Sequence, residues 1–137
     1  MKPYNQFKPI QIRWKEELKQ GNTPYLYRWT FLAFGYSMRI HHWIGNDVNP
    51  HFHDHSADFI SFLLYGSYIN HTPNGSVAKS APAFTYAKAE WKHWLEVGPR
   101  GAWTITFWGK PYRKWGFFVN GHKWRPLRYF HKFGKRD

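Results

Sequence analysis

The 137-residue sequence contains no cysteine. This absence excludes disulfide bonds, thiolate metal ligands and a cysteine nucleophile, and it is compatible with a reducing cytosol. No apolar run approaches the roughly 20 residues of a membrane helix, and the first residues lack an apolar stretch of signal-peptide length. We therefore expect a soluble, cytoplasmic protein that does not enter a membrane.

Acidic residues are also scarce, since 8 Asp and Glu against 20 Lys and Arg give a formal net charge of +12. Residues 29–109 are neutral, with five basic and five acidic side chains, so the excess lies in the flanks. Residues 1–28 contribute +4 and residues 110–137 contribute +8. A basic surface attracts phosphates and other anions. The flanks are therefore either a solvated surface or a contact for nucleic acid or an acidic partner.

Basic and aromatic residues alternate near the C-terminus, as a platform for stacked bases requires. They are Arg113, Lys114, Trp115, Trp124, Arg125, Arg128, Tyr129 and Phe130. The same aromatic side chains could instead pack the last strands onto the rest of the fold. The sequence leaves both interpretations open.

Aromatic residues make up 22% of the chain, and such residues suit the half-buried surface of a sheet. Many short apolar runs separated by turn signals are typical of a β-sandwich or barrel. The predicted strands are residues 25–34, 36–43, 59–69, 83–86, 91–97, 103–108, 117–119 and 122–124. The pair Asn120-Gly121 predicts a two-residue hairpin turn. Only residues 12–20 have a helical pattern.

The segment from residue 50 to residue 55, PHFHDH, holds the most distinctive chemistry. Side chains alternate along a strand, so His51, His53 and His55 point to one side and Asp54 to the other. Imidazoles at i and i+2 can converge on one divalent ion, such as Fe, Zn, Ni or Mn, with a third ligand from elsewhere. The alternative is a set of surface or hydrogen-bonded histidines.

Residues 53–66 resemble the first conserved motif of the cupins. That motif has two histidines one residue apart, here His53 and His55, and an acidic ligand four residues later. A glycine follows after seven more residues, here Gly66. The acidic position holds Phe59 instead, directly after Asp58. Residues 82–93 resemble a degenerate second motif, in which a turn with proline precedes a single histidine.

This resemblance implies an all-β, cupin-like double-stranded β-helix, a jelly-roll barrel, with His93 as the third metal ligand. We expect one domain over residues 1–137, with a barrel core at about 25–119. The basic flanks 1–24 and 120–137 would form a short helix or arm and a hairpin with a tail. Cupins often pair through strand edges, so a homodimer is one option, and the sequence leaves the oligomeric state open.

The stretch HDHSADF also resembles the HDHPWDF stretch of small cupins found in bacteria and phages. No substrate is established for that subgroup. If the chain is phage-encoded, its cytoplasm is that of the host.

Three neutral histidines without a carboxylate leave an ion with a higher charge and with positions open to water, dioxygen or an anionic substrate. We therefore expect a metal-dependent, iron-type oxygenase acting on a small or anionic substrate. The alternative is a non-catalytic cupin scaffold whose basic flanks contact nucleic acid or an acidic protein. Asp58 is either a fourth ligand or an acceptor that orients a ligating imidazole. His51 is a ligand, a proton shuttle at the mouth or a strand-edge residue.

Further polar contacts in the barrel are expected from a few strand residues. The candidates are Tyr36, Arg39, Ser61 and Tyr65. His41 and His42 are consecutive, so at most one of them faces the interior.

Overall fold

The computed structural model describes residues 9–20, 22–46 and 51–133. Its elements are β1 (Ile10–Gln20), β2 (Thr23–Ala33), β3 (Tyr36–Trp43), β4 (Phe59–Thr72), β5 (Gly75–Ser80), β6 (Ala83–Ala87), β7 (Trp94–Trp108), β8 (Phe117–Val119), β9 (His122–Trp124) and α1 (Pro126–Phe133). No helix in this part of the chain is long and apolar enough to cross a membrane.

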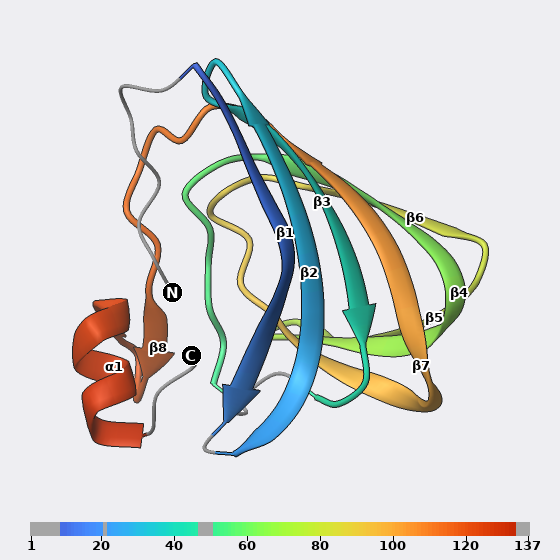
Figure 1. Ribbon diagram of the computed structural model, residues 1–137. Helices are drawn as coiled ribbons and strands as arrows, with labels where there is room; N and C mark the ends of the chain where they lie inside the picture. Colours follow the sequence, from blue (N-terminus) through green and yellow to red (C-terminus); the bar gives the residue numbers. More distant parts are fainter. Residues whose placement is uncertain (1–8, 21, 47–50, 134–137) are drawn as a thin grey trace.

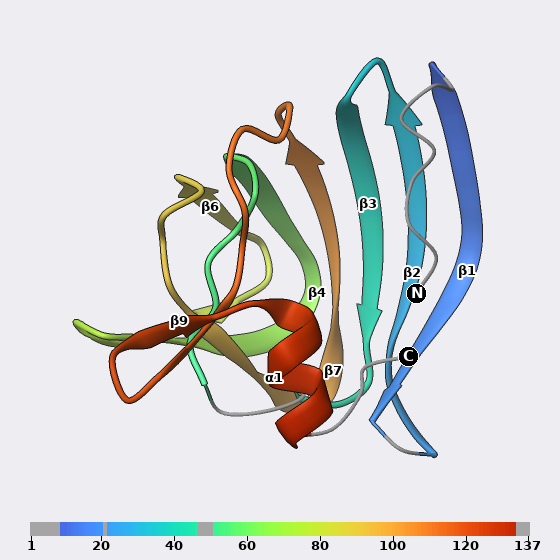
Figure 2. The same cartoon turned by 90° about the vertical axis from the view of Figure 1, so that its left-hand side faces the viewer.

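The strands form one large antiparallel sheet and one small hairpin. In the large sheet the neighbours run β1, β2, β3, β7, β4 and β5, and β6 pairs with β4. The sheet curls, and residues 51–58 (green in Figure 1) run along its concave side. Figure 2 shows α1 and the β8–β9 hairpin in front of this concave side. This architecture confirms the predicted all-β fold class.

A β-bulge with glycines on both strands lets β4 and β7 stay paired where the sheet bends sharply. Their register shifts between Gly66 and Tyr68, opposite the bulged residues 98–101 of β7. Gly66 has φ +84°, and a Cβ atom on it would lie 2.0 Å from the Gly101 carbonyl oxygen. The glycine of the first cupin-like motif is therefore required by the close crossing of two backbones. The sequence predicted two strands here, whereas β7 continues through the bulge as one.

The prediction of a helix at residues 12–20 is wrong, because this segment is part of β1 and pairs with β2. Ile10, Ile12 and Trp14 alternate on the exposed side of the strand, as a β pattern requires. A bulge between Arg13 and Glu16, with Lys15 at φ +46°, interrupts the alternation and shifts the apolar spacing towards that of a helix. The sheet therefore begins at residue 10, before the predicted core.

The C-terminal segment folds as the β8–β9 hairpin followed by the short helix α1, which the sequence did not predict. Asn120 and Gly121 have φ +52° and +80°, as expected for the predicted two-residue turn. The Tyr129 ring is fully buried and stacks on Phe117 at 3.8 Å. Phe130 also packs on Phe117. These contacts support the packing interpretation of the C-terminal aromatics, and a nucleic-acid contact through this segment stays a prediction.

The crossing at Gly66 generates a stability prediction. Gly66→Ala should lower the free energy of unfolding by at least about 3 kcal/mol, because the new methyl group meets backbone that cannot move without breaking the sheet. Gly121→Ala is the matched control, since Gly121 has a similar φ of +80° but nothing within 4 Å of an added Cβ. This substitution should lower the free energy of unfolding by only about 1 kcal/mol, because alanine is strained at a positive φ. Urea unfolding of both variants measures the difference, and equal losses would contradict a steric crossing.

Candidate metal centre

The segment of residues 51–58, called here the histidine loop, is held by backbone hydrogen bonds on both of its sides. On one side Phe52, Asp54, Ser56 and Asp58 bond to the chain between residues 109 and 118, at 2.8–3.1 Å for the principal bonds. On the other side His53 and His93 exchange two N–H···O bonds of 3.0 and 3.1 Å, and the His55 amide donates to Ala89 at 2.8 Å. The loop is therefore extended and alternates like a strand, although it belongs to neither sheet.

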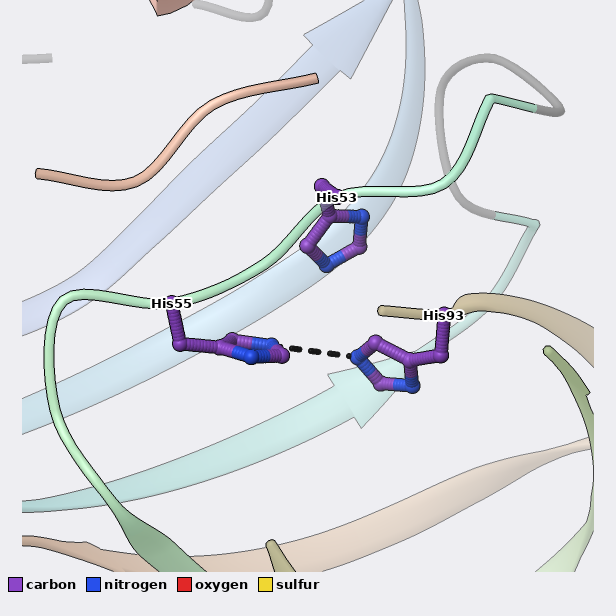
Figure 3. Close-up of side chains that lie close together, drawn as sticks. All are labelled: His53, His55 and His93. Carbon is purple, nitrogen blue, oxygen red and sulfur yellow. Dashed lines mark hydrogen bonds between the residues drawn. The ribbon is translucent and has the colours of Figure 1, made fainter. Parts of the chain in front are cut away.

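This alternation brings three imidazoles together on the inner side of the histidine loop. His53, His55 and His93 each offer one ring nitrogen, and these nitrogens all lie within 4.8 Å of one another. The Nε2 atoms of His55 and His93 are 3.2 Å apart. Figure 3 shows these two rings pointing toward each other with the His53 ring beside them. The structure thus joins the three residues that the sequence selected.

Asn70 fixes the orientation of the His93 ring. The His93 Nδ1 atom lies 2.8 Å from the Asn70 Oδ1 atom and donates its hydrogen to it. The Nε2 lone pair of His93 is therefore directed at the centre of the cluster. Second hydrogen bonds of this kind set the tautomer of metal-ligating histidines. Asn70 is absent from the residues predicted for the site, and the one signal in the sequence is its position on the inward side of β4.

Burial keeps two of these imidazoles neutral. Desolvation lowers the pKa of His55 to about 4, although the Asp54 carboxylate and the backbone of Trp91 oppose the shift. Desolvation and the neighbouring His55 also hold the pKa of His93 well below its ordinary value. Neutral imidazole is the form that binds a metal ion.

The donor set fits a divalent ion. Two nitrogens bound at about 2.05 Å in tetrahedral geometry lie roughly 3.3 Å apart, and the His55–His93 separation of 3.2 Å is close to this value. The third nitrogen has a looser spacing, within 4.8 Å, and His53 is the one member that is only half-buried. A small movement of the His53 ring would complete the site.

Phe59 occupies the position where the cupin motif has an acidic ligand. Its ring is buried, lies 4.8 Å from the His55 ring and stacks on Trp108 at 4.3 Å. Trp91 covers His93 from another direction, at 4.3 Å. Among the described residues, no carboxylate joins the cluster. The site therefore combines three nitrogen donors with aromatic rings that pack against His55 and His93.

Asp54 points away from the histidines, as the alternation of side chains predicted, and anchors the C-terminal segment. Its side chain is 1% exposed. The carboxylate accepts hydrogen bonds from the Gly116 amide at 2.8 Å, from Arg113 at 2.6 Å and from Lys123 at 2.8 Å. Two cations of the basic segment 110–137, Arg113 and Lys123, are therefore bonded inside the fold, where they hold the histidine loop.

His51 and Asp58 lie outside the cluster. His51 Nδ1 is 2.6 Å from the Tyr129 hydroxyl, beside α1. Asp58 Oδ1 accepts hydrogen bonds from the Ala89 amide and the Tyr112 hydroxyl, at 2.8 and 2.7 Å. A catalytic role for either residue stays a prediction.

The histidine cluster opens into a cavity of about 680 Å³ inside the curled sheet. Of the predicted polar contacts, Arg39 and Ser61 line this cavity, whereas Tyr36 and Tyr65 are exposed outside it. His41 lines the cavity, and His42 stacks on Trp103 outside it at 4.1 Å. The prediction that at most one of this pair faces inward is confirmed.

Comparison with family models and with curated protein sequences finds no match. Comparison with solved structures finds several similar chains. An RmlC-like cupin from Shewanella frigidimarina NCIMB 400 is 14% identical, with a TM-score of 0.57 over 77% of this chain and 96% of that chain. An RmlC-like cupin from Ralstonia eutropha JMP134 is 12% identical, with a TM-score of 0.58 over 92% and 87%.

A third similar structure is FeII HppE, which is 13% identical, with a TM-score of 0.58 over 73% of this chain. The match spans 56% of that chain, so this protein corresponds to little more than half of it. These similarities show that the protein has the cupin jelly-roll fold. Within that fold it carries a three-histidine group that could hold a metal ion.

The low pKa of His55 generates a prediction for the metal-free protein. Below pH 6.5 the unfolded chain protonates this histidine, whereas the folded protein resists protonation down to about pH 4. Acidification across this window should therefore remove about 3 kcal/mol of unfolding free energy. His55→Gln should reduce this pH dependence in urea unfolding, with the part due to the buried His41 and His93 remaining, and the exposed His122→Gln should leave it unchanged. An unchanged pH dependence in His55→Gln would show that its burial is not the cause.

Proposed function

We propose that this protein is a metal-dependent cupin enzyme of the oxygenase type, with one divalent ion bound by His53, His55 and His93. The observation that carries this proposal is the convergence of three imidazole nitrogens within 4.8 Å at the wall of a large internal cavity. A structural histidine cluster would not require an adjoining cavity of about 680 Å³. Cavities of this size are typical of small-molecule sites.

The ligand set supports oxygenase chemistry over a closed structural site. An ion held by three neutral imidazoles keeps its full charge and has open positions, so it supplies Lewis acidity and, as iron, reactivity toward dioxygen. The similarity to FeII HppE supports iron as an ion that this fold accommodates. Phe59 and Trp108 exclude water from one side of the cluster. Asn70 holds the His93 ring with its Nε2 atom toward His55, where the ring would serve as a ligand.

Metal titration tests this proposal directly. The metal-free protein should bind one Co²⁺ per chain, and replacing a ligand in His53→Gln or His93→Gln should weaken binding by more than about 100-fold. Asn70→Leu should cost about 10–100-fold, as expected for loss of a hydrogen bond to a ligating imidazole. The exposed His122→Gln is the control and should bind Co²⁺ like the unmodified chain.

Far-UV circular dichroism of each variant separates loss of the ligand from loss of the fold. Stoichiometric Co²⁺ binding that survives His93→Gln in the folded protein would refute the three-histidine site. Absence of Co²⁺ binding by the unmodified chain would favour the alternative of a non-catalytic scaffold.

A further inference from the structure

Polar side chains form a continuous row across the inner face of the sheet. The strand register places them directly opposite one another, from β6 through β4, β7 and β3 to β2. In this order they are Thr85, Ser61, Thr106, Arg39 and Thr30. The four hydroxyl residues are at most 8% exposed. An interior that only packed against itself would be apolar, because buried polar groups need partners.

The next row along the strands is polar as well. Thr104, His41 and Arg28 lie opposite one another on β7, β3 and β2. Arg28 is paired with Glu16, with 3.3 Å between Nη2 and Oε1. Two adjacent rows of the barrel interior therefore carry polar groups.

Arg39 connects these rows with the metal centre. Its guanidinium carbon lies 4.6 Å from the centroid of the Trp108 ring, and that ring lies 5.6 Å from the His55 ring. The Trp108 indole N–H donates to the Thr106 hydroxyl at 2.8 Å, which fixes the ring between Arg39 and His55. Desolvation is the main cause of the low pKa of His55 and of His41, and the positive charge of Arg39 lowers both pKa values further. Arg39 is thus one aromatic ring away from the cluster.

The charges that line the cavity favour an anion. Among the described lining residues, the cations are Arg28 and Arg39, and the single carboxylate is Asp54. Arg28 is paired with Glu16, so the anion is assigned to Arg39. Both oxygens of Asp54 already accept hydrogen bonds from the Gly116 amide and from C-terminal cations. Apolar residues line the cavity as well: Leu26 lies one inward position beyond Arg28 on β2 and is paired with Leu18 on β1.

We propose that the cavity binds a small organic anion, whose carboxylate or similar oxyanion pairs with Arg39 and the neighbouring hydroxyl of Ser61. The apolar body of the ligand lies against Leu18 and Leu26. This inference rests on the proposed function in one respect, since it identifies the anion as the substrate class of the metal site. A guanidinium offers two parallel N–H donors to an oxyanion, which lysine cannot do.

The test uses the full chain in metal-free form, with 4-phenylbutyrate as the anionic probe and its neutral amide as the matched control. Isothermal titration calorimetry should show the carboxylate binding at least about tenfold more tightly than the amide. Arg39→Met should abolish this preference, and Arg39→Lys should restore part of it. Arg100→Met, at an exposed position of the β7 bulge, should leave the preference unchanged.

Equal affinity for acid and amide, no binding of the acid at millimolar concentration, or an Arg39→Met variant that keeps the preference would each overturn the anion site. Circular dichroism and Co²⁺ titration of Arg39→Met show whether the variant is folded, and Arg39→Lys provides a second variant if it is not. Arg39-dependent probe binding without Co²⁺ binding would leave the anion site standing and refute the metal proposal. Co²⁺ binding without probe binding would leave the metal proposal standing and refute the anion site.

Discussion

The site depends on the extended backbone of the histidine loop, which is hydrogen-bonded on both sides. Because side chains alternate along it, Asp54 is directed into the C-terminal segment while His53 and His55 are directed into the barrel. The bonds between His53 and His93 then fix the distance between the loop and the start of β7. Three imidazoles from two distant parts of the chain can therefore meet, although the backbone that carries them lies outside the regular sheets.

The basic C-terminal region has a structural task in this arrangement. Arg113 and Lys123 both donate to the buried Asp54 carboxylate, and removing one partner of a buried charge pair is strongly destabilising. Phe117 packs against both His53 and Tyr129. The C-terminal hairpin and helix thus pack over the histidine loop. The basic C-terminal region, which the charge pattern set apart from the barrel, therefore supports the histidine cluster.

Much of this arrangement follows from local patterns, and the rest depends on long-range register. The spacing of His53 and His55 and the Asn120-Gly121 turn are local signals. The structure confirms that the two histidines share a side and that the turn forms, whereas metal ligation stays a prediction. The edge strand β1 was predicted as a helix, because the bulge at Lys15 disrupts the alternation of its side chains. The contact of Asn70 with His93 and the polar row through Arg39 depend on which strands are neighbours, and a single sequence does not contain that information.

The central claim is that three imidazoles bind one ion without a protein carboxylate. X-ray absorption spectroscopy of the Co²⁺-loaded protein tests it most directly, because multiple scattering from imidazole rings counts the histidines in the coordination shell. The account predicts three imidazoles per cobalt, with only light solvent atoms in the remaining positions. A shell with two imidazoles or fewer, or one that loses an oxygen ligand when Asp58 is replaced by alanine, would contradict it.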